Sequence, residues 1–524
     1  MATSPSSHIK TVGTKRKFRW VPSDLLFLAW YVLILLVIVL HLPKMIMLYY
    51  AERATMISFG IIGIWRYGWW FNHMIRSSVY RYIVFPKRRV KADCLWASGW
   101  RPQRLFFMMT TFQELQSTTE IVLQSIMDEC AQVSVPVKLF IGTGADSDEV
   151  IIENFFAKQT VPFSFEVVII RQKRPGKRYA IGETMRAIVR HGLTPEDLVI
   201  FMDGDTFFEP GCLRLCLPFF QLHPNMQALT THEDVIVEQG PTWVKKWLEM
   251  RFAQRDFTMQ SHALSNKILT LTGRMSIFRG KHLCEPEFIQ IVENDHLKHW
   301  LWGDYRFLSG DDKSTWYYLL KAGADMLYIP DAVTVTIEYI HGNGLDRMKE
   351  NLRRWNGNTL RNGARAMSLG PKKTGFFIWW CLVDQRCAVW TMLIGHMMFI
   401  ILAASSGAIF LLIAFLRIAF SRLCISLILF THARRIDMSF PLLVYVNQLV
   451  STLIKVYIVF RLPQQRWKNR GDQHAGYAVP RGMKVKSWVA TYLTVFYCTC
   501  CFFFILLCLK LVSLPTLSDI MMIF

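Results

Sequence analysis

Two long apolar regions, one toward each end of the chain, most constrain what this protein can fold into. Residues 25–43 carry no Asp, Glu, Lys or Arg and are long enough to cross a bilayer as one helix. Residues 387–416 and 487–509 are equally free of these four residue types. A soluble enzyme does not need such stretches. We therefore expect a multi-pass membrane protein whose middle part is soluble.

Charge patterns suggest how the chain crosses the membrane. Residues 1–20 are basic and contain no acid, which predicts a cytoplasmic N-terminus before the first span. A weaker second span is expected at residues 54–75, and the basic residues after it return the chain to the cytoplasm. Residues 1–91 thus form an N-terminal membrane unit, residues 92–375 a cytoplasmic domain, and residues 376–524 a second membrane unit.

The C-terminal unit has three or four apolar segments by length, and residues 440–460 are the doubtful one. Basic residues stand on both sides of this segment, so a single crossing would break the rule that basic loops stay in the cytoplasm. The segment also contains Asn447, Gln448 and Lys455. Either this segment is interfacial or re-entrant, or the charge rule fails here.

The overall charge narrows the choice of partners. Sixty Lys and Arg residues against 39 Asp and Glu residues give a net charge of +21. Such an excess suits nucleic acid, an anionic membrane surface or an anionic ligand. The chain has no zinc-finger, RNP-type or KH-type motif, so we expect no nucleic-acid partner. Membrane lipids and an anionic ligand remain.

The middle of the chain alternates between short apolar runs and helical patterns. The runs at residues 105–110, 137–141, 167–170 and 198–202 predict strands, and residues 120–130 and 181–191 predict helices between them. Alternating strands and helices predict an α/β domain with a parallel sheet. Functional residues in such domains lie at the carboxyl ends of the strands.

Two acidic motifs follow this pattern. Asp203 and Asp205, with one glycine between them, come directly after a predicted strand, where two carboxylates can hold Mg²⁺ or Mn²⁺ together with a diphosphate. An ordinary Asp-Gly turn is the alternative. Asp311 and Asp312 are adjacent, so each raises the pKa of the other and one can serve as a general base. A helix N-cap is the alternative there, and both roles are compatible.

A third motif is basic and aromatic. In the sequence from Asn351 to Trp355, Arg354 can neutralise a departing diphosphate and Trp355 can stack on a sugar ring. A membrane-surface amphipathic helix also favours Arg and Trp, and is the alternative.

Two weaker motifs follow other predicted strands. Lys177 and Arg178 can contact a nucleotide diphosphate or lie in a solvated turn. Asp146 and Asp148 can meet a base or a ribose.

The order of the motifs is more specific than any one of them. An acidic strand end, DGD, GDD and RRW occur in this order between two sets of apolar spans. The chain resembles the processive, membrane-integrated family-2 glycosyltransferases, which include cellulose, chitin and hyaluronan synthases. Their pattern is Asp, DxD, an acidic base motif and QxxRW. Asn351 stands here in place of the Gln, which leaves the acceptor contact at that position open.

Within this group the chain resembles the catalytic subunits of bacterial mannuronan (alginate) synthases. Residues 251–255 (RFAQR), 269–279 (LTLTGRMSIFR) and 307–316 (FLSGDDKSTW) carry the resemblance. It implies a GT-A domain inserted between membrane helices, GDP-mannuronic acid as donor, a divalent metal, inversion at the anomeric carbon and a β-1,4-polymannuronate product. It also implies the bacterial inner membrane, a PilZ-type cyclic-di-GMP receptor subunit and other envelope polysaccharide-export proteins as partners.

The resemblance also assigns roles to residues. It implies metal and donor binding by Asp203 and Asp205, donor binding by Lys177, Arg178 and either Asp146 or Asp148, and catalysis by Asp312, Asp311, Arg354 and Trp355. In the proposed mechanism, Asp312 deprotonates the acceptor 4-hydroxyl, Arg354 stabilises the departing nucleotide and Trp355 borders the acceptor.

An anionic product would explain the charged residues that lie within or beside the apolar spans. Charges within or beside apolar spans are costly and usually face a cavity or a partner. We expect a polymer channel lined by Arg66, Arg417, Arg422 and Lys455. Snorkelling of each side chain to the lipid headgroups is the alternative. Arg274 is a candidate contact for the uronate carboxylate of the donor.

Three other functions compete with this interpretation. A synthase of a neutral or amino-sugar polymer would use a UDP-sugar and need fewer cations in the membrane. A transporter would carry the soluble segment only for regulation. A catalytically inactive envelope subunit would keep the fold but not need the ordered carboxylate motifs. The intact motifs argue against the last two.

Overall fold

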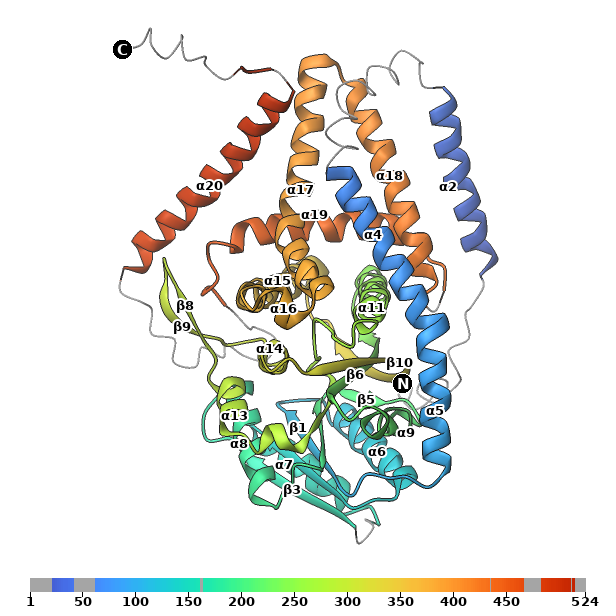
Figure 1. Ribbon diagram of the computed structural model, residues 1–524, viewed down its shortest axis with the longest axis vertical. Coiled ribbons are helices and arrows are strands. Elements are labelled where there is room, and N and C mark those ends of the chain that lie inside the picture. Colours follow the sequence, from blue (N-terminus) through green and yellow to red (C-terminus); the bar gives the residue numbers. More distant parts are fainter. Residues whose placement is uncertain are drawn as a thin grey trace.

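The computed structural model describes residues 21–41, 62–160, 164–433, 435–465, 482–509 and 511–513. An α/β part and a helical part lie one above the other (Figure 1). The basic segment 1–20, the first eight residues of the predicted second span and the basic loop 466–481 lie outside the described residues.

The α/β part is built on an eight-stranded sheet with the order β3-β2-β1-β4-β7-β6-β10-β5. Its strands are β1 (Leu105–Thr111), β2 (Val137–Thr143), β3 (Phe165–Arg171), β4 (Leu198–Asp203), β5 (Thr206–Phe208), β6 (Met226–Gln239), β7 (Met275–Arg279) and β10 (Asp325–Tyr339). The four predicted strands are confirmed and are parallel to one another.

The prediction of a parallel sheet holds for β1 to β4 among themselves, but the sheet as a whole is mixed. β7 is antiparallel to both of its neighbours, β4 and β6, and β5 is antiparallel to β10. The alternation of strand and helix predicts only the first four strands, and every antiparallel pairing involves a later one. The sheet and the helices around it form the α/β domain that the sequence predicts.

The central strands are buried on both faces. All seven residues of β1 and the apolar residues of β4 are buried, as the continuous apolar runs require. The helices of this part are α6 (Gln116–Val133), α7 (Asp146–Phe156), α8 (Lys177–Arg190), α9 (Cys212–Cys216), α10 (Pro218–Leu222), α12 (Gly280–Leu283), α13 (Pro286–Glu293) and α14 (Asp311–Lys321). A small hairpin, β8 (His296–His299) with β9 (Gly303–Arg306), stands beside them.

Three helices join the sheet to the helical part. They are α11 (Thr242–Ala263), α15 (Gly344–Met367) and α16 (Gly370–Thr374), and they lie between the two parts (Figure 1). α11 packs against β6 and β10 on one side and against α4, α18 and α19 on the other. α15 contacts α14, α17 and α19. Residues on these helices can therefore face either part.

The helical part contains α2 (Pro22–Leu40), α4 (Ile62–Val79), α17 (Phe376–Ser406), α18 (Ile409–Phe430), α19 (Phe440–Ile458) and α20 (Met483–Cys508). A π-helical turn, η2 (Tyr80–Val84), continues α4 into α5 (Phe85–Ala97). Among the described residues, five helices are long and apolar enough to cross a membrane: α2, α17, α18, α19 and α20. No residue of α2 is buried, so its apolar side chains face outward as a lipid environment requires. The protein is a membrane protein.

Two helices depart from a simple bundle. α4, which is the described end of the weaker predicted span, is not one of the five candidates. α19 lies across the direction of α17 and α18 rather than beside them (Figure 1). This is the orientation expected of an interfacial helix, and it agrees with the polar residues in its sequence.

Candidate active site

A pocket of about 390 Å³ opens at the carboxyl ends of β1 and β4. Every residue of the DGD and GDD motifs lines it, and so do Arg354 and Trp355 of the RRW motif, although they come from different elements. Its charged lining residues are Glu114, Lys177, Asp203, Asp205, Arg274, Asp311, Asp312, Glu338, Arg347 and Arg354. The DGD motif lies at a strand end, as expected of functional residues in such a sheet, and α14 and α15 bring the other two motifs to the same pocket.

The centre of this pocket is a lysine between two carboxylates. Lys177, the first residue of α8, places its Nζ 2.6 Å from Asp203 Oδ1 and 3.6 Å from Asp311 Oδ2. Burial opposes the charge of Lys177, but Asp203 and Asp311 outweigh burial and raise its pKa. Burial raises the pKa of Asp203, and the neighbouring Asp205 and Asp311 add to this despite Lys177. The carboxylates thus crowd one another.

This crowding fits a divalent cation. Asp203 and Asp205 offer hard oxygen donors at a strand end, which are the ligands that Mg²⁺ and Mn²⁺ prefer. The backbone at Gly273 leaves the space beside them open, because a Cβ there would lie 3.5 Å from Asp203 Oδ2 and from Lys177 Nζ, and 3.6 Å from Asp311 Oδ2. A cation and a diphosphate would relieve the repulsion among the acids.

Asp312 has the properties of a general base. Burial, and then the adjacent Asp311 carboxylate, raise the pKa of Asp312 to about 6. Burial also acts on Asp311, but Lys177 and Arg178 outweigh it and hold the pKa of Asp311 below its ordinary value. Two neighbouring acids whose pKa values are pushed apart can take different roles. Asp311 and Asp312 also lie in the first turn of α14. The two acids therefore occupy a helix start as well as the pocket.

Arg354 and Trp355 reach the same pocket from α15. Arg354 Nη2 lies 3.5 Å from Asn351 Oδ1, the residue that stands where the family pattern has Gln. The ring of Trp355 stacks on Trp247, with centroids 5.8 Å apart and planes 23° apart. Trp247 therefore covers one face of Trp355 and holds its ring in the pocket wall, where an aromatic side chain can border a sugar ring.

Of two arginines predicted to bind the donor, the structure places Arg178 outside the pocket lining and Arg274 within it. Arg178 is 3% exposed and does not line the pocket, because its guanidinium donates to Val292 O and Ser309 O and holds the loop before α14. Arg274 does line the pocket. Its guanidinium lies 3.1 Å from Glu233 Oε2 and 3.7 Å from Glu338 Oε1, so two acids already balance its charge.

The structure separates the two candidates for nucleoside binding. Asp146 is exposed and forms an ion pair with Arg171. Asp148 is buried, and its Oδ2 accepts a hydrogen bond from the backbone N–H of Gln113, 2.8 Å away. Gln113 lines the pocket, so Asp148 supports the pocket wall through Gln113 and is the closer of the two to the site.

Several lining residues were not among those predicted from the sequence: Gln113, Glu114, Glu338, His341 and Arg347. Arg347 Nη2 lies 2.6 Å from Glu338 Oε2. Gln113 and Glu114 follow the end of β1, so the strand-end rule that singled out Asp203 could also have found them. The sequence carries no comparable signal for Glu338 and Arg347, which meet only through folding.

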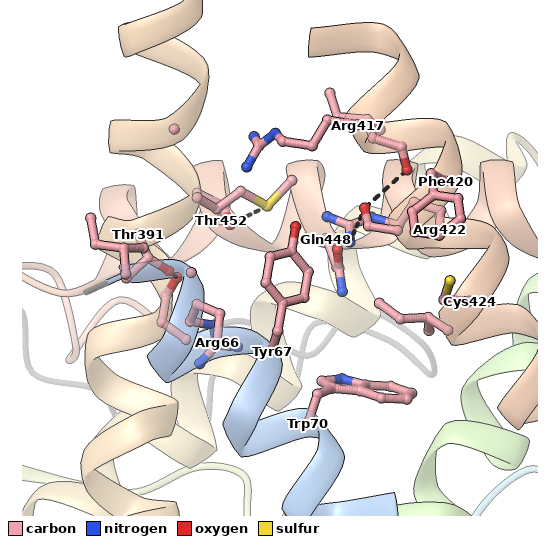
Figure 2. A pocket seen from close by; sticks show the side chains of 18 of the residues that line it. Arg66, Tyr67, Trp70, Thr391, Arg417, Phe420, Arg422, Cys424, Gln448 and Thr452 are labelled. Atoms are coloured by element: carbon pink, nitrogen blue, oxygen red, sulfur yellow. Dashed lines mark hydrogen bonds between the residues drawn. The ribbon is translucent and has the colours of Figure 1, made fainter. Parts of the chain in front are cut away.

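A second, larger cavity of about 880 Å³ lies among α4, α11, α17, α18 and α19. All four residues predicted for a polymer channel line it: Arg66, Arg417, Arg422 and Lys455. Arg251 from α11 lines it too, and none of the described lining residues is Asp or Glu. Figure 2 shows Arg66, Arg417 and Arg422 around Tyr67 and Trp70. The cations thus share one cavity.

Comparison with known proteins agrees with the fold and the motifs. Residues 102–358 match the family described as Glycosyltransferase like family 2. The chain is 38% identical over 409 residues to a protein named Glycosyltransferase alg8 from Pseudomonas syringae pv. tomato, covering 78% of this chain and 83% of that one. A protein of the same name from Azotobacter vinelandii is 35% identical over 409 residues, covering 78% and 82%.

Among solved structures, the mannosyltransferase PcManGT from Pyrobaculum calidifontis, in complex with GDP-Man and Mn²⁺, is similar with a TM-score of 0.44 and 14% identity. It covers 73% of this chain and 99% of that one. The relatives confirm the resemblance found in the sequence. The chain is a glycosyltransferase and belongs to the alg8 glycosyltransferase family.

Proposed function

We propose that this glycosyltransferase polymerises mannuronic acid from GDP-mannuronic acid into β-1,4-polymannuronate and passes the chain through the cation-lined cavity. The observation that carries the proposal is the adjacency of two sites. A pocket holds the transferase motifs, and a cavity beyond it holds five cationic side chains and no described acid. A polymer with one carboxylate per sugar has use for such a cavity, and a neutral polymer does not.

The donor end of the reaction follows from the carboxylates and cations at the strand ends. Asp203 and Asp205 would hold Mg²⁺ or Mn²⁺, which when bound neutralises the donor diphosphate. Lys177, already charged between Asp203 and Asp311, contacts the same diphosphate, and Arg354 stabilises the negative charge that develops on the departing nucleotide. These groups are in place before the reaction, so little rearrangement is needed.

The acceptor end uses Asp312 and Trp355. The acceptor sugar stacks at Trp355, and Asp312 takes the proton of its 4-hydroxyl as the oxygen attacks the anomeric carbon of the donor. The bond from that carbon to the diphosphate breaks on the opposite face, so the configuration inverts. Asp311, held ionised by Lys177 and Arg178, keeps the proton affinity of Asp312 high.

The setting of the enzyme is part of the proposal. The multi-pass chain would lie in the bacterial inner membrane with its GT-A domain in the cytoplasm, where the nucleotide-sugar is found. A PilZ-type cyclic-di-GMP receptor and the polysaccharide-export proteins of the envelope would act with it. The resemblance to alginate synthases supports these partners.

One experiment tests the donor. The chain is purified into lipid with its envelope partners, Mg²⁺ and cyclic-di-GMP, and is given GDP-mannuronic acid or, in parallel, UDP-sugars. We expect high-mass polymer from GDP-mannuronic acid only, and none from the Asp312→Asn variant. Polymer from a UDP-sugar alone would keep the chemistry but overturn the mannuronate assignment.

A further inference from the structure

The catalytic pocket and the cation-lined cavity meet at Trp355. Trp355 lines the pocket, and the guanidinium carbon of Arg251 lies 5.6 Å from the centre of its ring. Arg251 in turn lines the cavity. The aromatic ring at which the acceptor stacks therefore touches a cation of the cavity wall. A sugar chain that leaves Trp355 toward the cavity meets Arg251.

The charge of Arg251 has no acid beside it. Its Nη1 donates to Gln254 Oε1 at 2.8 Å, its Nε is buried without an acceptor, and no described carboxylate forms an ion pair with it. Burial lowers the pKa of Arg251 to about 10, so the side chain stays cationic at neutral pH. A buried charge without a counter-ion is costly, and an anion in the cavity would remove this cost.

Lys455 of α19 is a second such cation in the same cavity. No described residue forms a hydrogen bond or ion pair with its ammonium, and it repels Arg251 electrostatically. Asp384 attracts Lys455 at longer range, but that carboxylate is engaged by Arg66. Arg251 and Lys455 therefore lie near each other in the cavity, and neither forms an ion pair with a described carboxylate.

We propose that Arg251 and Lys455 form a subsite for the carboxylate of a uronate residue in the growing chain, next to the acceptor ring stacked at Trp355. This inference rests on the proposed function. The guanidinium of Arg251 offers a planar pair of donors that matches a carboxylate, and Lys455 adds a point charge. The subsite holds the polymer on the enzyme between additions and selects uronate chains over neutral ones.

The test is a binding measurement that does not need turnover. The full chain in lipid nanodiscs is titrated with short oligomannuronates, and with the same oligosaccharides after reduction of their carboxylates to alcohols. We expect the wild type to prefer the charged ligand by about tenfold or more, the scale of a charge-assisted hydrogen bond. Arg251→Met and Lys455→Met each lose most of this preference. Arg251→Lys, which keeps the charge, retains part of it.

Lys245→Met is the matched control, because Lys245 is an exposed lysine on the same helix as Arg251, and it should bind like the wild type. Unchanged preference in both Met variants would overturn the subsite, and so would equal loss of charged and neutral ligands. Turnover is measured on the same preparations. A wild type that polymerises GDP-mannuronic acid while the variants keep their ligand preference would refute the subsite alone. A wild type that uses only neutral donors would refute the proposed function.

Discussion

The catalytic pocket and the cavity above it bind negative charge in opposite ways. In the pocket, cations stand beside acids: Lys177 lies between Asp203 and Asp311, and Arg274 lies between Glu233 and Glu338. In the cavity, five cations line the wall without one described acid. Paired charges fix a diphosphate in one geometry. Cations spread over a large cavity whose described lining residues include no acid attract a polyanion without fixing it, which suits a chain that must move on.

The difference predicts that single charges matter most in the pocket. The largest effect is expected for Asp312→Asn, which removes the proton acceptor and should lower the rate of sugar transfer by about 10²–10⁴-fold. The rate of GDP release from GDP-mannuronic acid measures it. Asp346→Asn, an exposed acid on α15, is the control. If the Asp312→Asn variant transferred sugar at the wild-type rate, Asp312 would not be the general base.

Removal of the metal ion should affect the catalytic pocket but not the cavity. Chelation should reduce sugar transfer by about a hundredfold or more, because the diphosphate charge then lacks its main counter-charge, and added Mg²⁺ or Mn²⁺ should restore it. Binding of oligomannuronate in the cavity should not change. If chelation weakened oligomannuronate binding as strongly as transfer, the two regions would not be independent.

The pH profile sharpens the role of the acid pair. The pKa of Asp312 is raised to about 6, and the base works only when ionised. The transfer rate should therefore be flat above this pH and fall about tenfold for each unit below it. Initial rates in buffers of constant ionic strength give the profile. A rate that stayed flat down to pH 4.5 would contradict a base with this pKa.

Charge removal in the cavity should affect product length more than chemistry. Arg417→Met combined with Arg422→Met should shorten the polymer several-fold, since a weaker cationic field holds the polyanion less well. Transfer of the first sugars should remain within about twofold, because neither residue lines the pocket. Chromatographic sizing of the product decides the matter, and full-length polymer at wild-type yield would show that the cavity does not carry the chain.

The smallest effect concerns the glycine beside the acids. Gly273→Ala adds a methyl group 3.5 Å from Asp203 Oδ2 and from Lys177 Nζ, an ordinary contact that the fold can tolerate. The methyl group takes space next to the diphosphate, so the KM of the donor should rise by about two- to fivefold. Gly363→Ala, with no atom within 4 Å, is the control and should match the wild type. If the wild type, Gly273→Ala and Gly363→Ala had equal KM values for the donor, the diphosphate would not bind beside Gly273.

The sequence identifies the residues that sit at strand ends and in short motifs. Asp203 and Asp312 could be found because their position after a strand and before a helix already limits where their side chains go. Arg178 could not be placed correctly, since adjacent residues at a helix start face different directions, and only Lys177 faces the pocket. The later strands were also missed, because β6, β7 and β10 pair across long sequence separations that no local pattern records.

The cavity shows the same limit. Arg66, Arg417, Arg422 and Lys455 stand out in sequence because a charge inside an apolar span is conspicuous. Arg251 lies in a segment that carries the family resemblance, but its sequence does not assign it to the cavity, because α11 carries polar residues along its whole length and contacts both parts of the molecule. Its role depends on Trp355 and α19, which come from other parts of the chain.

The most direct test of the account is to locate the polymer in the working enzyme. The chain is stopped during synthesis by omitting donor after a short pulse, and its structure is then determined in a lipid nanodisc. The account predicts a sugar chain that begins at Trp355, passes Arg251 and runs through the cavity beside Arg417 and Arg422. A polymer that left the pocket by another path, with lipid filling the cavity, would contradict the claim that the two regions act in series.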